Sequence, residues 1–177
     1  MKLKKLVLYI LIAGLAAFTV SAKTLVVYFS WGGTTKELAG QIQKSTGADI
    51  FRLEPEEPYP SSYTPTTKVA KDELGKNIYR KVKESPDLSG YDTVFVGAPV
   101  WWHTAPMIVQ GWLKDNEKSL SGKTVVPFVT YASTYRDETL AKIAELTPKS
   151  KHLEGFGTRS PSQSETDAWL KKIGQIK

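Results

Sequence analysis

The chain has 177 residues, 41% of them hydrophobic, and a formal net charge of +6. This length supports one compact hydrophobic core and is short for two domains. The sequence contains no cysteine, which excludes a disulfide framework, a CxxC redox pair, a thiolate metal site and lipid attachment through an N-terminal cysteine.

The first 22 residues differ in composition from the rest. Three lysines within the first five positions precede an apolar run over residues 6–20, and small residues end the segment at Ala22. This order is typical of a secretory signal that is cleaved. An uncleaved membrane anchor and a buried N-terminal helix are the alternatives, and the run is shorter than the about 20 apolar residues that a span needs. Signal or anchor would place residues 23–177 outside the cytoplasm, because the lysines stay inside.

The remaining chain is only mildly basic. Without the three leading lysines, 21 Lys and Arg residues stand against 18 acidic residues. Lys and Arg do not cluster with interleaved aromatic residues, as they do in many nucleic-acid-binding proteins. We therefore expect no nucleic-acid partner, and membrane contact only through the N-terminal segment.

After residue 22, short apolar runs alternate with amphipathic stretches, which predicts a parallel sheet covered by helices. The run over residues 25–29 is apolar throughout, as expected of a central strand buried on both faces. Further strands are predicted at 49–53, 93–98, 124–130 and 151–157; helices at 34–45, 69–82, 105–116, 138–146 and 164–176; and a surface loop over 54–67. With right-handed crossovers, five strands and about five helices form a three-layer αβα sandwich.

Three loops at the carboxyl ends of strands are the candidate ligand site, because α/β sheets bind ligands at that edge. The first loop separates the first strand from the first helix and is rich in glycine and hydroxyl groups. Its converging N–H groups and the helix N-terminus suit a phosphate. Neither GxGxxG nor GxxxxGK[ST] is present, which favours a mononucleotide or another monophosphate; a hydroxyl-capped helix after a glycine turn is the alternative. The loop consists of Ser30, Trp31, Gly32, Gly33, Thr34 and Thr35.

The second loop follows the third strand and carries adjacent tryptophans. A planar heteroaromatic ring is what two indoles at a ligand edge can cover, although core packing of one or both is the alternative. His103 could exchange a proton beside such a ring, or it could simply line the loop. The candidate residues are Pro99, Val100, Trp101, Trp102, His103 and Thr104.

The third loop, residues 130–135, follows the fourth strand. Its small residues would let the backbone approach a ring edge, and its hydroxyl groups could form hydrogen bonds. The candidate residues are Thr130, Tyr131, Ala132 and Ser133.

The first two loops resemble known sequences. Residues 28–35 resemble the phosphate loop of flavodoxins, and residues 97–102 resemble their second flavin loop. The resemblance extends over residues 23–177 and implies a sheet of order 2-1-3-4-5, with flavin mononucleotide (FMN) held by the three loops at the edge of strands one and three. The direct passage from the fifth strand to the last helix resembles the short-chain form.

The sequence also departs from that family. Thr34 stands where asparagine is common. His103 stands where a small residue is expected, and the third loop lacks glycines. These last two differences concern the tuning of the redox potential more than the binding of FMN. Residues 59–63 resemble a segment near the flavin pocket in another branch of the family. Tyr63 is therefore a candidate lid over the flavin, with anchoring of a long loop as the alternative.

Three functions are compatible with these residues. The first is an FMN-containing electron carrier with a membrane-bound or extracytoplasmic redox partner. The second is an FMN-dependent quinone or NAD(P)H oxidoreductase in which His103 or Tyr63 assists proton transfer. The third is a non-redox binding module of the same fold. Receiver-type signalling is excluded because strand one ends in Ser30 and Trp31 rather than in the carboxylates that bind Mg²⁺, and no metal site is predicted.

Overall fold

The computed structural model describes residues 23–177. The predicted signal or anchor, residues 1–22, lies outside the described residues. None of the helices found between residues 23 and 177 combines the length and the apolar character needed to cross a membrane.

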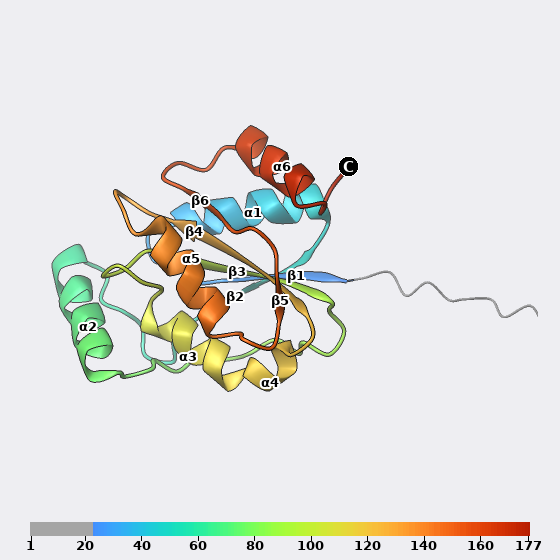
Figure 1. Cartoon of the computed structure of the whole chain (residues 1–177). Helices are drawn as coiled ribbons and strands as arrows, with labels where there is room; N and C mark the ends of the chain where they lie inside the picture. Colours follow the sequence, from blue (N-terminus) through green and yellow to red (C-terminus); the bar gives the residue numbers. More distant parts are fainter. Residues whose placement is uncertain (1–22) are drawn as a thin grey trace, which may run out of the picture.

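A parallel sheet forms the centre of the domain (Figure 1). Its strands follow the order β2-β1-β3-β4-β5, and β6 also pairs with β4. The predicted α/β fold class and strand order are therefore confirmed. The strands are β1 (Thr24–Tyr28), β2 (Asp49–Arg52), β3 (Thr93–Pro99), β4 (Thr124–Thr130), β5 (Lys151–His152) and β6 (Phe156–Thr158).

The predicted fifth strand is wrong in one respect, since it is divided into β5 and β6. Both pieces pair with β4, and residues 153–155 separate them, although the Leu153 N–H still donates to the Val125 carbonyl oxygen at 3.4 Å. The cause lies in β4, because Pro127 has no N–H to donate to the neighbouring strand at this point. Gly155 passes so close to Pro127 that a Cβ at position 155 would lie 2.9 Å from the Pro127 carbonyl oxygen.

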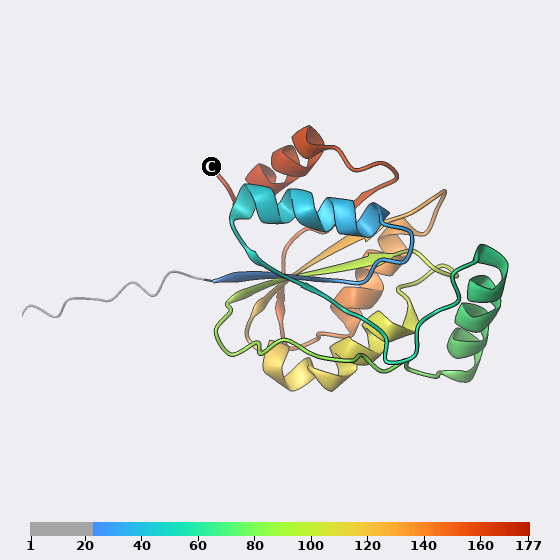
Figure 2. The ribbon, with the colours of Figure 1, turned by 180° about the vertical axis from the view of Figure 1, so that it is seen from behind.

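Five helices cover the two faces of the sheet (Figures 1 and 2). One face carries α1 (Thr34–Thr46) and α6 (Gln163–Lys172), and the other carries α3 (Met107–Asp115), α4 (Glu117–Leu120) and α5 (Arg136–Glu145). The apolar side chains of each face form a separate core. The α1/α6 core includes Leu38, Ile42, Phe95, Phe128 and Leu170, and the opposite core includes Val96, Ile108, Trp112, Leu113 and Ile143.

The helix predicted at 69–82 is misplaced. The structure has α2 at Tyr63–Lys76, so the predicted loop over 54–67 also overran its first turn. Asn77 ends α2 with a φ of 54°, and Val82, which fitted the helical period, instead forms an isolated bridge with Pro55. Figures 1 and 2 place α2 beyond the carboxyl ends of the strands, outside both helical layers.

Candidate functional site

The first loop forms a compact turn at the start of α1. Ser30 is buried, and its Oγ accepts a hydrogen bond from the Gly33 N–H at 3.1 Å. Gly33 has a φ of 98°, which favours glycine, and directly precedes the first helical residue. A Cβ at Gly32 or Gly33 would meet no atom within 4 Å. The N-terminus of α1 therefore faces open space across a glycine surface, as an anion site requires.

A buried hydroxyl pair connects the first loop to the third. Thr35 and Thr130, which are 1% and 4% exposed, share a hydrogen bond of 2.7 Å between their Oγ1 atoms. Arg52 donates to the Ser30 carbonyl oxygen at 3.1 Å from the other side. The phosphate-type loop is thus fixed by strands β2 and β4 as well as by its own turn.

The second loop contains a strained two-residue turn. Trp101 and Thr104 exchange two backbone hydrogen bonds, of 2.9 and 3.1 Å, so Trp102 and His103 occupy the central positions. Their φ values are 48° and 69°, the region that such hairpin turns usually fill with Asn-Gly. This turn directs both side chains outward from the end of β3.

A cavity of 320 Å³ lies between the second loop and α2. Aromatic side chains form much of its wall, and no carboxylate lines it. Seven of the residues predicted from the sequence come together here: Trp31, Tyr63, Val100, Trp101, Trp102, His103 and Ala132. The sequence did not indicate the three that α2 adds, Thr66, Thr67 and Ala70.

Trp101 is supported from behind by buried aromatic rings. Its ring lies edge-on to Phe29 and Tyr59, at centroid distances of 5.5 and 5.1 Å. The Tyr59 hydroxyl donates to Glu73 Oε2 at 2.8 Å, and Arg80 Nε pairs with Glu73 Oε1 at 2.5 Å. Burial, followed by the negative charge of Glu73, raises the pKa of the Tyr59 phenol well above its ordinary value.

Two indole N–H groups attach the α2 segment (residues 59–80) to the loops. Trp31 Nε1 donates to the Pro60 carbonyl oxygen, and Trp102 Nε1 donates to that of Thr67, both at 3.0 Å. The ammonium of Lys71 lies 5.0 Å from the Trp102 ring centroid. The α2 segment therefore closes the outer side of the cavity through polar contacts.

The third loop divides between two surfaces. Ala132 faces the cavity, whereas Tyr131 lines a separate groove of 740 Å³ beside β6 and α6. Arg159 lies 5.6 Å from the Tyr131 ring centroid and donates to the Ser133 carbonyl oxygen. Tyr135, the last residue of the predicted third loop but not one of its candidate cofactor residues, stacks on His103 at a ring-centroid distance of 3.6 Å. Predicted residues that do not line the cavity are Ser30, Gly32, Gly33, Thr34, Thr35, Pro99, Thr104, Thr130, Tyr131 and Ser133.

The sequence could have indicated only some of the site residues that the prediction left out. Thr66 and Thr67 fall in the predicted loop over 54–67, and Ala70 falls in the helix predicted at 69–82, whereas the structure places all three on α2. Without the correct start of α2, no pattern could assign them to the site. Tyr135 lies within the predicted third loop, but the sequence does not indicate that its ring stacks on His103.

The domain is similar in structure to several solved proteins. A protein assigned as a flavoprotein from Bacteroides eggerthii shares 29% identity, covering 86% of this chain and 98% of its own, with a TM-score of 0.75. A flavoprotein from Lactobacillus acidophilus, solved in complex with FMN, shares 23% identity over 84% of this chain and 99% of its own, with a TM-score of 0.70. Megasphaera elsdenii flavodoxin shares 17% identity over 84% of this chain and 98% of its own, with a TM-score of 0.52.

The sequence comparisons give two further results. A search of curated proteins finds no match. The sequence profile of a flavodoxin family matches residues 23–173, which is nearly the whole of the described domain. Together with the strand order and the loops at its carboxyl edge, this match shows that the chain belongs to the flavodoxin family.

Proposed function

We propose that this protein binds FMN and transfers electrons as a flavodoxin outside the cytoplasm. The observation that carries the proposal is the placement of an open helix N-terminus and an aromatic cavity at one edge of the sheet. A flavin mononucleotide has the two matching parts, a phosphate and a flat heterocycle. The FMN complex of the Lactobacillus acidophilus relative supports the same cofactor here.

The residues present fit this cofactor. The N–H groups of the glycine turn and of the first turn of α1 would hold the phosphate. Trp101 and Trp102 would cover the ring, and Ala132 leaves room for its edge. Bound FMN would supply one-electron and two-electron redox chemistry. The chain's own residues would hold it, exclude water and set the charge around it.

The direct test is FMN titration of residues 23–177, followed by absorbance and fluorescence. Gly32→Asp should weaken binding more than about a hundredfold, because it places a carboxylate against the phosphate. Position 32 is preferable to Gly33, whose φ of 98° would strain any side chain. Gly32→Asn is the matched control, since it adds the same bulk without charge. Equal affinities of the Asp and Asn variants would disprove the phosphate site.

An FMN-dependent quinone or NAD(P)H oxidoreductase is the second candidate. It is favoured by the presence of His103 and Tyr63, two groups able to move a proton, in the wall of the cavity. Turnover of a quinone with NADH or NADPH that falls in His103→Gln and in Tyr63→Phe would support it. A carrier would exchange electrons with a redox partner and show no such turnover.

We further propose that residues 1–22 export or anchor the domain, and that its redox partner is membrane-bound or extracytoplasmic. The lysines, apolar run and small residues of this segment support the proposal. A general secretory route passes an unfolded chain, so FMN would load after export. Fractionation of cells that express the full chain tests this: recovery in the cytosol with the leader intact would contradict it.

A further inference from the structure

The exposed face of α2 is positively charged. Thr64, Lys68, Lys71 and Gly75 are exposed and share one helical face. The two carboxylates of α2 are already paired, Asp72 with Lys76 and Glu73 with Arg80. Within residues 23–177, Lys68 and Lys71 form no salt bridge. Asp72 is exposed beside Lys68, four residues further along α2, but its carboxylate is paired with Lys76. This face therefore offers a partner two lysines that form no ion pair within the described residues.

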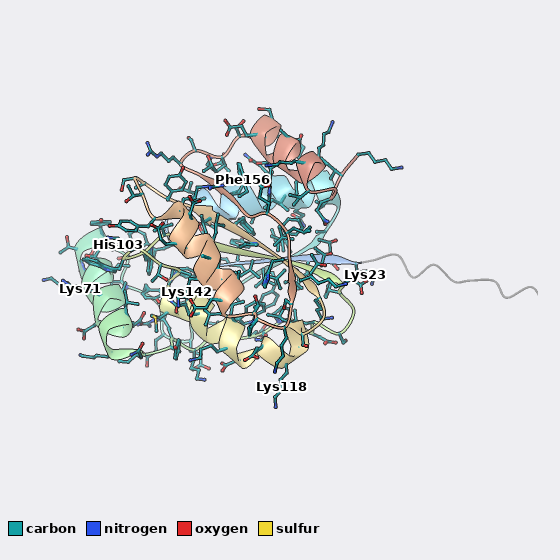
Figure 3. The ribbon with its side chains drawn as sticks, viewed as in Figure 1. Lys23, Lys71, His103, Lys118, Lys142 and Phe156 are labelled. Carbon is teal, nitrogen blue, oxygen red and sulfur yellow. The ribbon has the colours of Figure 1, made fainter. Side chains whose placement is uncertain are left out.

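The charged face adjoins the mouth of the aromatic cavity. Lys71 lies 5.0 Å from the ring centroid of Trp102, which itself lines the cavity. Tyr63, the first residue of α2, is 73% exposed and lines the same cavity. Figure 3 shows Lys71 on the outer side of α2, with His103 between α2 and the sheet.

Exposed aromatic rings are concentrated at this end of the molecule. Four of the six exposed large hydrophobic residues found among residues 23–177 border the site, and all four are aromatic. A group of exposed rings beside unpaired charges is typical of a protein docking surface. The four are Trp31, Tyr63, Trp102 and Tyr135.

Other carboxylates lie near this end. Glu37 belongs to the first turn of α1, Asp137 and Glu138 to that of α5, and Glu165 to that of α6. Glu56 and Glu57 lie near Arg80, beyond the last turn of α2. They would repel an acidic partner there and leave α2 as the favourable side. This distribution of charge would determine the side from which a partner protein approaches as well as the charge that the partner carries.

We propose that an acidic redox-partner protein docks on Tyr63, Lys68, Lys71 and Trp102. Its carboxylates would meet the two lysines, and its apolar surface would cover Tyr63 and Trp102. The redox role of this partner rests on the proposed function, whereas the docking itself does not require FMN. Docking here brings the partner directly against the outer wall of the flavin cavity.

A capped, fluorescent decapeptide of glutamate tests the docking surface, with a lysine decapeptide as the reference. We expect Lys68→Gln/Lys71→Gln to weaken glutamate-peptide binding about tenfold, with or without FMN, and 0.5 M salt to abolish it. Lys118→Gln/Lys151→Gln removes two exposed lysines elsewhere and should change affinity less than about twofold (Lys118 is labelled in Figure 3). Equal loss in both double variants, or binding of both peptides, would overturn the proposal.

Small redox ions test the same surface in the FMN-loaded protein. Electron transfer to ferricyanide, an anion, should slow severalfold in Lys68→Gln/Lys71→Gln, and transfer to hexaammineruthenium(III), a cation, should quicken. Unaltered rates for both ions would contradict docking beside the flavin, while a normal FMN affinity would leave the proposed function intact. Binding to anionic lipid vesicles without binding to the glutamate peptide would replace the acidic protein with a membrane surface.

Discussion

The helix that lines the aromatic cavity, α2, and the neighbouring helix α3 are held in different ways. In α3 the buried side chains include Met107, Ile108, Trp112 and Leu113, each of which packs into the core. In α2 the buried residues are Thr66, Ala70 and Glu73. Burial of each large apolar side chain contributes about 1.5–3 kcal/mol, whereas hydrogen bonds contribute about 1 kcal/mol each. α3 therefore belongs to the core, whereas we expect α2, the outer wall of the cavity, to open while the core stays folded.

The largest effect on stability is expected from a substitution in the core helix α3. Ile108→Ala should lower the global free energy of unfolding by about 3 kcal/mol, because Ile108 is fully buried and its loss leaves a void. Val69→Ala in α2 should cost about 1 kcal/mol or less, since Val69 is only partly buried. Denaturant titration of both variants measures the difference. Similar losses would show that α2 is as much a part of the core as α3.

A smaller and local effect is expected from the ion pair of the α2 segment. Glu73→Gln leaves the nearly buried Arg80 guanidinium without its counter-charge and should cost about 2 kcal/mol. Hydrogen exchange should become faster over residues 63–80 and remain slow in β3. Glu117→Gln, which removes an exposed pair with Lys149, is the control and should change little. Faster exchange throughout β3 as well would contradict independent opening.

Alkaline pH should also act first on the α2 segment. Burial and Glu73 raise the Tyr59 pKa in the folded state, so its contribution to stability is complete below pH 10 and is lost as pH rises above that value. The loss is up to about 1.4 kcal/mol for each pH unit. Tyr59→Phe should lose less stability between pH 10 and 11 than the unmodified protein, as measured by urea unfolding at each pH. Parallel pH profiles would exclude this role.

The smallest effect is expected from the indole tethers. Trp102→Phe removes the hydrogen bond to the Thr67 carbonyl oxygen but keeps an aromatic ring, and should cost about 0.5–1 kcal/mol. Trp31→Phe should act similarly at Pro60. Exchange of the amides of residues 63–70 would report both. No change in either variant would mean that the two indole hydrogen bonds do not hold α2 in place.

The difference between the core and α2 also explains how much of the fold could be predicted from the sequence. Strands such as β1 and β3 are apolar runs buried on both faces, so their positions and order follow from composition and chain topology. The glycine turn at Gly33 carries its own local signal. The position of α2 depends on contacts with residues far away in the sequence, including Trp31 and Trp102, which no local period records.

The divided edge strand shows the same limit on a smaller scale. Residues 151–157 read as one strand because their own composition allows it. The interruption comes from Pro127 of the neighbouring strand, which withholds a hydrogen-bond donor. Its effect emerges only when the pairing register is known.

The turn at Trp102 and His103 carries a consequence for attempts to increase thermal stability. Two non-glycine residues with positive φ cost on the order of 1 kcal/mol each. A stability-guided redesign would therefore choose Asn-Gly for these positions. That choice would remove the indole tether to α2 and the stacking partner of Tyr135. A more heat-resistant hairpin would thus be obtained together with a looser wall of the aromatic cavity, so this turn is the place where thermal durability and the shape of the cavity make opposite demands.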